Sequence, residues 1–179
     1  MERRYLKCRE LSQKRAIEII TMINSIWPPK DILSEIQYSE RYIAKNENND
    51  LILYLDSGKI FAHAMSFIRE IKTDYGLMKI LAIKGIAVKP EYRDKNFGKK
   101  IVLDAFSSLD TKNLNLSLFQ TGVPSFYKKL GARTVKNRFI NSLNNEDPQS
   151  NPWWDKEVMI YPGSAEFPDG VIDLLGSGY

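Results

Sequence analysis

The sequence has little of what a metal centre or a disulfide framework requires. Among its 179 residues there is one cysteine, Cys8, and one histidine, His63. A single cysteine cannot form an intrachain disulfide, and no cluster of cysteine and histidine is available to hold zinc or iron. This composition suits a reducing compartment. We therefore expect a cytoplasmic protein with no metal site.

Long apolar runs are also missing. The basic start, Met1 to Arg15, is not followed by an apolar stretch of signal-peptide length, and no segment approaches the roughly 20 apolar residues of a membrane-spanning helix. We expect no membrane partner. With 43% hydrophobic and 27% charged residues, the chain has the composition of an ordinary folded protein and a length that suits one core. The sequence therefore predicts a single domain over residues 1–179.

Positive charge is concentrated in one short segment. The net charge is +4, and residues 89–100 alone hold two acidic residues, Glu91 and Asp94, and the basic residues Lys89, Arg93, Lys95, Lys99 and Lys100. Such a cluster suits a compact polyanion better than a nucleic acid, which requires basic residues along a whole face together with aromatic stacking positions. The isoelectric point of about 9.0 is the only feature in favour of nucleic-acid binding. We expect no nucleic-acid partner.

The spacing of apolar residues predicts two helices before a sheet and a mixed order afterwards. Ser12 is the expected cap of a first helix and Asp31 that of a second, whose apolar face includes Ile32, Ile36 and Ile43. Strands are expected at 5–8, 51–55, 59–68, 79–88, 115–119, 135–143 and 157–161, and further helices at 98–109 and 124–130. This pattern predicts an α/β layer fold.

The most informative segment is a buried strand that runs through a turn directly into a helix. Ile86, Ala87 and Val88 end the strand, and the helix is expected from Gly98. Backbone N–H groups at a helix start have no partner within the helix and carry the positive end of its dipole, so they bind a phosphate readily. Lys99 and Lys100 stand in the first turn, where cations are unfavourable unless an anion is present. The segment therefore predicts an anion site.

Two ordered motifs carry a resemblance to a known family. The first, Arg93-x-x-Asn96-x-Gly98, resembles the pyrophosphate loop of the GNAT acetyltransferase superfamily, with Asn96 in the place of its first glycine. Asparagine enters left-handed backbone conformations more easily than other non-glycine residues, so the exchange is tolerable. Downstream, residues 123–132 resemble the family's Phe-Tyr-x-x-x-Gly helix through Phe126, Tyr127 and Gly131. The resemblance implies a mixed, mostly antiparallel sheet flanked by helices and splayed around an acetyl-CoA groove.

The same resemblance implies an enzyme that transfers an acetyl group from acetyl-CoA to an amine. In the family, the pantetheine arm lies along the strand and the pyrophosphate rests on the turn, and Tyr127 matches a tyrosine that protonates the departing thiolate. The implied coenzyme-binding residues are Ile86, Ala87, Val88, Arg93, Asp94, Lys95, Asn96, Phe97, Gly98 and Lys99. Cys8 stands in the first strand, which favours direct transfer in a ternary complex over an acyl-cysteine intermediate.

The general base and the acceptor are not determined by the sequence. A narrower resemblance to aminoglycoside 2'-N-acetyltransferases places Lys84 where those enzymes carry a glutamate base, and a protonated lysine cannot serve as one. The candidates for the base are therefore Glu70 or Asp74 through water, or the chain-end carboxylate of Tyr179 if the tail folds back. Lys84 could instead hold an acidic acceptor.

Three further points stay open. His63 stands among apolar residues, which favours a packed histidine over a catalytic one. Trp153 and Trp154 either line an acceptor pocket or pack a late strand. The alternative function is a GNAT-like module that binds acyl-CoA without turnover. For the enzyme, we expect a small-molecule or peptide amine as the acceptor. The expected oligomeric state is a monomer or a homodimer.

Overall fold

The computed structural model describes residues 1–30 and 33–179. The chain forms two compact units, each built from two segments: residues 1–67 with 84–105, and residues 68–83 with 106–179. The strands β3 (Lys59–Thr73) and β4 (Gly76–Val88) contribute residues to both units. The expectation of a single domain stays a prediction.

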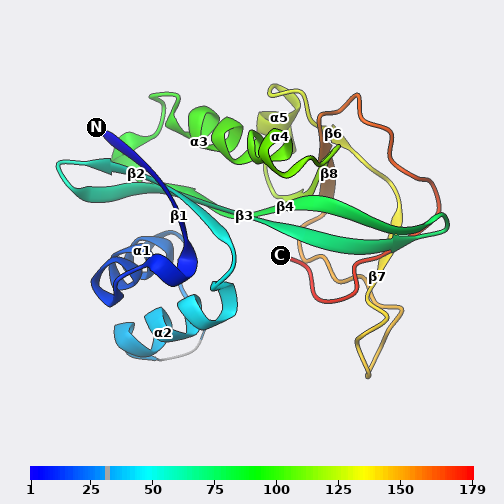
Figure 1. Ribbon diagram of the computed structural model, residues 1–179, viewed down its shortest axis with the longest axis horizontal. Helices are drawn as coiled ribbons and strands as arrows, with labels where there is room; N and C mark the ends of the chain where they lie inside the picture. Colours follow the sequence, from blue (N-terminus) through cyan, green and yellow to red (C-terminus); the bar gives the residue numbers. More distant parts are fainter. Residues whose placement is uncertain (31–32) are drawn as a thin grey trace. The chain divides into compact units, whose positions relative to one another are not determined.

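The first unit is a sheet with helices on both faces. Its antiparallel strands follow the order β1-β2-β3-β4, and Figure 1 shows α1 and α2 together on one side of these strands and α3 on the other. Its further elements are β1 (Glu2–Lys7), α1 (Gln13–Ile26), α2 (Glu35–Asn46), β2 (Asp50–Asp56) and most of α3 (Phe97–Phe106). Because side chains alternate along a strand, β2 turns its leucines towards α1 and Tyr54 the other way, towards α3.

Side-chain caps fix the starts of both early helices. The Ser12 hydroxyl accepts a hydrogen bond from the Arg15 N–H at 3.4 Å, which confirms the expected cap of α1. The second helix begins three residues later than the sequence suggested: Ser34 caps it and forms a capping box with Gln37. Asp31 and Ile32, named in the earlier prediction, lie outside the described residues. Ile36, expected on the apolar face, is 52% exposed.

The second unit combines parallel and antiparallel pairing. The strand β5 (Ser117–Thr121) runs parallel to β4, which it meets at Leu81 and Ala82, and antiparallel to β8 (Glu157–Tyr161), which in turn pairs with β6 (Arg133–Thr134). The strand β9 (Val171–Asp173) pairs with β3 and runs parallel to β7 (Arg138–Ile140). Two short helices, α4 (Ser108–Lys112) and α5 (Pro124–Lys128), complete the unit.

Several predicted elements were wrong in extent. The helix expected over 98–109 is two helices, α3 and α4. The strand expected over 135–143 is confined to β7, Arg138–Ile140, and β6 lies before the expected range. The strand β9 was not predicted. The predicted class is confirmed: the fold is a mixed α/β arrangement with a mostly antiparallel sheet flanked by helices. The splay around an acetyl-CoA groove stays a prediction.

None of the helices in the described ranges combines the length and the apolar composition that crossing a membrane requires.

Candidate active site

The strand–turn–helix segment of the first unit has the backbone of an anion site. The strand β4 ends at Val88, a short 3-10 turn covers Pro90–Tyr92, and α3 begins at Phe97. Between them, Asp94 and Asn96 have positive φ angles of 60° and 63°. The left-handed conformation expected at Asn96 is therefore present, and the second one, at Asp94, was not expected. Two such residues so close together turn the chain sharply into the helix.

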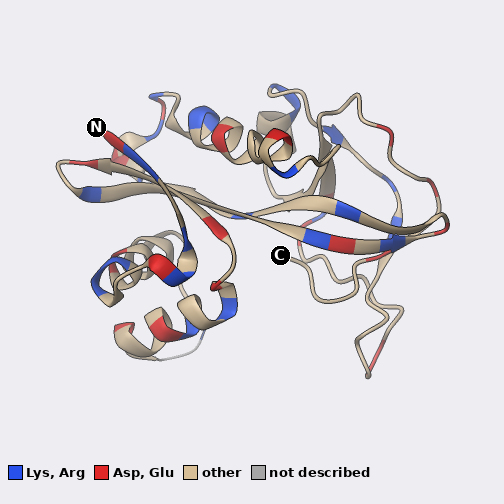
Figure 2. Ribbon diagram, viewed as in Figure 1, with Lys and Arg blue, Asp and Glu red and all other residues tan. Residues whose placement is uncertain are grey.

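The start of α3 leaves backbone donors available. The carbonyl of Asn96 accepts the N–H of Lys100 at 3.0 Å, the first bond of the helical ladder. The amides of Phe97, Gly98 and Lys99 precede this first bond, and a helix offers no acceptor of its own to its first N–H groups. Asn96 and Lys99 are exposed, so a ligand can reach this end of the helix. Figure 2 shows basic residues on the turn that leads into α3 and on its first turn.

The basic side chains of the turn bind the turn itself. Arg93 Nε donates to the carbonyl of Val88 at 3.1 Å, and Lys95 Nζ donates to the carbonyl of Glu91 at 3.1 Å. Both side chains are exposed and keep their charge near the turn. The predicted residues from Arg93 to Lys99 therefore lie at the carboxyl end of β4, and two of them, Arg93 and Lys95, also hydrogen-bond the backbone there.

A cluster of four aromatic rings packs together at the two ends of the turn: Tyr54, Phe61, Tyr92 and Phe97. Phe61 stacks on Tyr92 with ring centres 4.1 Å apart and meets the edge of Phe97 at 4.9 Å. Tyr92 also donates its hydroxyl proton to Asp56 at 2.9 Å. Because Phe61 is 1% exposed and Phe97 8%, burial of these rings fixes both ends of the turn.

A bonded histidine lies beside the bend of β4. Gly85 has a φ of 60°, and His63 Nδ1 lies 2.6 Å from its carbonyl oxygen. The hydroxyl of Tyr42 lies 2.6 Å from His63 Nε2. Burial lowers the pKa of His63 from 6.5 to about 4, so the ring is neutral near pH 7. His63 is packed as predicted, at 1% exposure. Gly85, a glycine inside an apolar strand, could have indicated a bulge, although not the contact with His63.

The sequence-predicted acid, Tyr127, belongs to the second unit. It lies on α5 at 7% exposure, with its ring 4.8 Å from that of Phe119 and 5.1 Å from that of Phe126. Burial, with a smaller contribution from Asp155, raises its pKa to about 12. The phenol therefore holds its proton throughout the neutral range. Gly131, the expected stop after this helix, has a φ of 93°.

The tail of the chain returns to β5. The Tyr179 hydroxyl donates to the carbonyl of Leu118 at 2.8 Å, and Gln120 Nε2 donates to a backbone oxygen of Tyr179 at 2.9 Å. Gln120, which the sequence did not single out, also accepts the N–H groups of Trp154 and Asp155 through its side-chain oxygen. One amide side chain therefore joins the tail to the segment before β8.

The two neighbouring tryptophans have different surroundings. The ring of Trp153 is 6% exposed and packs against Tyr179 at 4.9 Å and Phe139 at 5.8 Å, whereas Trp154 is 71% exposed. No described residue pairs with the buried Nε1 of Trp153. The packed interpretation suits Trp153, and a substrate role for either residue stays a prediction.

Lys84, the expected contact for an acidic acceptor, lies in the first unit on β4. Its Nζ lies 5.0 Å from the centre of the Phe67 ring, a distance typical of a cation–π contact. The role of Lys84 in binding the acceptor stays a prediction. The role of Glu70 or Asp74 as general base stays a prediction as well.

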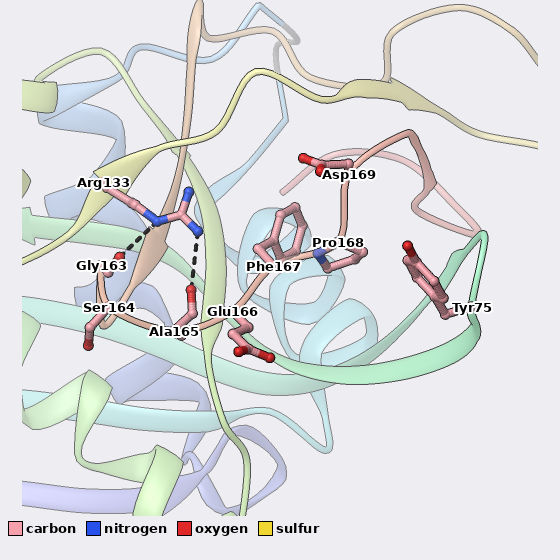
Figure 3. A pocket seen from close by; sticks show the side chains of 9 residues that line it. All are labelled: Tyr75, Arg133, Gly163, Ser164, Ala165, Glu166, Phe167, Pro168 and Asp169. Atoms are coloured by element: carbon pink, nitrogen blue, oxygen red, sulfur yellow. Dashed lines mark hydrogen bonds between the residues drawn. The ribbon is translucent and has the colours of Figure 1, made fainter.

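A separate cavity of about 620 Å³ lies in the second unit, lined by Tyr75, Arg133 and residues 163–169. Arg133 supports its wall by donating to the carbonyls of Gly163 at 2.7 Å and Ala165 at 3.1 Å, as Figure 3 shows. None of the sequence-predicted site residues lines this cavity. Within residues 1–30 and 33–179, no group of three histidine, cysteine, aspartate or glutamate side chains is placed to hold a metal ion.

Comparisons with known proteins concern the family and the fold. A family model described as an acetyltransferase (GNAT) domain matches residues 7–135. No curated protein sequence matches the chain. Solved structures of similar fold include a GNAT-family acetyltransferase from Staphylococcus aureus Mu50, with 16% identity, 89% of this chain and 98% of that one covered, and a TM-score of 0.59. ElaA from Escherichia coli has 17% identity, 89% and 97% coverage and a TM-score of 0.57.

An acetyltransferase from Trypanosoma brucei is also similar, with 17% identity, 75% of this chain and 95% of that one covered, and a TM-score of 0.58. At these identities the likeness shows the fold, and the family model shows the membership. The chain belongs to the GNAT acetyltransferase family, and it is an acyltransferase. Enzymes of this family typically take the acyl group from acyl-coenzyme A.

Proposed function

We propose that this protein transfers an acetyl group from acetyl-CoA to an amine of a small molecule or peptide, directly within a ternary complex. The observation that carries the proposal is the turn at Asn96, with its φ of 63° and its helix start at Phe97. Amides at such a start bind the diphosphate of the coenzyme. The strand residues Ile86–Val88 would then hydrogen-bond the pantetheine arm, as the family resemblance implies.

The state of the lone cysteine supports direct transfer. Cys8 is 0% exposed, and burial raises the pKa of its thiol to about 11. Because the thiolate is the nucleophile, a buried thiol with a raised pKa is a poor acceptor for an acyl group. The amine therefore attacks the thioester without a covalent enzyme intermediate in this proposal.

Tyr127 is assigned as the donor to the departing thiolate. Its pKa of about 12 lies above the value near 8.5 of a thiol in water. Full proton transfer then costs about 5 kcal/mol if the thiol keeps its value in water. A hydrogen bond from the phenol that strengthens as the thiolate charge develops requires no such transfer. In this assignment the tyrosine stabilises the leaving group first and donates its proton late.

Calorimetry with acetyl-CoA tests the coenzyme site through a matched pair of variants. Asn96→Asp tolerates the left-handed backbone and adds a negative charge, so we expect Kd to rise about tenfold or more, because two like charges about 4 Å apart repel by about 1 to 4 kcal/mol in water or near a surface. Asn96→Gly permits the same backbone without the charge and should bind within about threefold of the parent. Absence of acetyl-CoA binding by the parent would refute the proposal.

Release of coenzyme A with a panel of amines tests the reaction itself. Polyamines, amino sugars and peptide N-termini cover the classes of acceptor that the proposal allows. Binding of acetyl-CoA without release of coenzyme A for any of them would favour a module that binds the coenzyme without turnover.

A further inference from the structure

The backbone of β4 is irregular just before the residues assigned to the coenzyme. Gly85 lies inside the strand with a φ of 60°. A glycine in this conformation within a strand is typical of a β-bulge, in which one extra residue bends the strand and changes the direction of the residues that follow. The residues that follow Gly85 are Ile86, Ala87 and Val88.

The register of the strands supports a bulge at this place. A two-residue turn joins β3, which ends at Thr73, to β4, which begins at Gly76. With regular pairing from that turn onwards, Phe61 would lie opposite Val88. Instead, the N–H of Lys89 donates to the carbonyl of Phe61 at 2.9 Å. Between the turn and this bond, β4 therefore contains one residue more than β3.

A side chain binds the carbonyl at the bend. His63 Nδ1 lies 2.6 Å from the Gly85 oxygen. A carbonyl only accepts, so Nδ1 carries the proton, and Nε2 of the neutral ring accepts the hydroxyl proton of Tyr42 at 2.6 Å. The backbone of Tyr42 is itself held, because Asn46 Nδ2 donates to its carbonyl at 2.7 Å. The chain of bonds from α2 through β3 to β4 thus fixes the tautomer and the orientation of the ring.

The fit around the ring leaves little freedom. His63 Cε1 lies 3.1 Å from the place that a Cβ on Gly85 would occupy, so the ring packs directly against the bend. Two titratable side chains act on the ring. Tyr42 bonds it, and the charge of Lys84, from β4 itself, contributes to the lowered pKa of His63. Both nitrogens of the buried ring are hydrogen-bonded, as is usual for a buried polar group. The ring is therefore held in one orientation against the bend.

We propose that His63, oriented by Tyr42, is a positioning residue that holds the bulge at Gly85 and so directs the backbone groups of Ile86–Val88 towards the coenzyme. The proposal rests on the proposed function for its ligand and on the geometry alone for the bulge. His63 itself touches neither the coenzyme nor the acceptor in this role.

Three substitutions at His63 separate the bond to Gly85 from the packing of the ring. Asparagine places an amide nitrogen near the position of Nδ1 and can keep the bond, glutamine reaches towards Tyr42 instead, and leucine fills the space without bonds. We expect His63→Leu and His63→Gln to raise the Kd for acetyl-CoA about tenfold, and His63→Asn to bind within about threefold of the parent. Tyr42→Phe, which leaves His63 in place, should have an intermediate effect.

Amide hydrogen exchange provides a readout that needs no coenzyme. Exchange at Ile86–Val88 should be faster in His63→Leu than in the parent and restored in His63→Asn, while exchange in β1 stays unchanged. Equal exchange at Ile86–Val88 in all folded variants, or equal Kd values for His63→Leu and the parent, would overturn the proposal. If His63→Leu does not fold, the same two measurements are compared between Tyr42→Phe and His63→Asn. Faster exchange at Ile86–Val88 and a higher Kd in Tyr42→Phe would support the proposal, and equal values would overturn it. A parent that fails to bind acetyl-CoA refutes the proposed function, and the exchange data still decide the role of His63 at the bulge.

Discussion

The buried histidine leads to a prediction about acid stability that is independent of the substrate. Burial is the largest cause that lowers the pKa of His63 from 6.5 to about 4, whereas the unfolded chain leaves the imidazole in water at about 6.5. Between these values the unfolded state binds a proton that the folded state excludes. The free energy of unfolding therefore falls as the pH falls through this window, and the contribution is complete above it. At 1.36 kcal/mol for each pKa unit, the loss is about 3 kcal/mol by pH 4.

Urea unfolding at intervals of about one pH unit between about 7 and about 4 measures this loss. The matched variant is His63→Asn, which does not titrate, and carboxylates common to both proteins cancel in the difference. We expect the parent to lose about 3 kcal/mol relative to the variant across the window and nothing further below it, where both states are protonated. Curves that stay parallel from about pH 7 to about pH 4 would show that the folded protein accepts the proton at no cost, and the reasoning would be wrong.

Three other substitutions have defined outcomes. Gly85→Ala should lower the free energy of unfolding in urea more than Gly58→Ala does. Both positions have positive φ angles, which cost alanine about 1 to 2 kcal/mol, but of the two only Gly85 has a neighbour, His63 Cε1 at 3.1 Å, in the way of a Cβ. Equal losses would show that the ring moves aside freely. Phe61→Ala should cost about 3 to 5 kcal/mol, since this ring is 1% exposed, and a loss under about 1 kcal/mol would contradict the importance of the aromatic cluster. Tyr127→Phe should lower kcat about a hundredfold with little change in the KM for acetyl-CoA, and an unchanged kcat would remove its role as acid.

Local chemistry explains why part of the site could be predicted. The apolar run that ends at Val88, the proline after it and the glycine at residue 98 predicted a strand, a turn and a helix, and each of these is present. Asparagine in place of glycine predicted a left-handed residue at 96, where φ is 63°. The same conformation at Asp94 was not predicted, because aspartate accepts a positive φ but adopts other turn conformations far more often.

The missed features depend on pairing between distant segments. The strand expected over 135–143 is confined to Arg138–Ile140, which pairs with β9, while β6, just before the expected range, pairs with β8. The apolar pattern therefore predicted a longer strand than the pairing with β9 supports. The contact of His63 with Gly85 joins residues on adjacent strands whose register depends on a bulge, and neither residue type alone indicates its partner.

The two left-handed residues in the turn after β4 have a practical meaning for recognising related sequences. The geometry that exposes the helix amides requires a residue that accepts a positive φ at position 96, and here asparagine supplies it at 63°. A motif search that demands glycine at this position would therefore overlook chains of the same architecture. Patterns written in terms of permitted backbone angles, with asparagine and aspartate admitted beside glycine, would recover them.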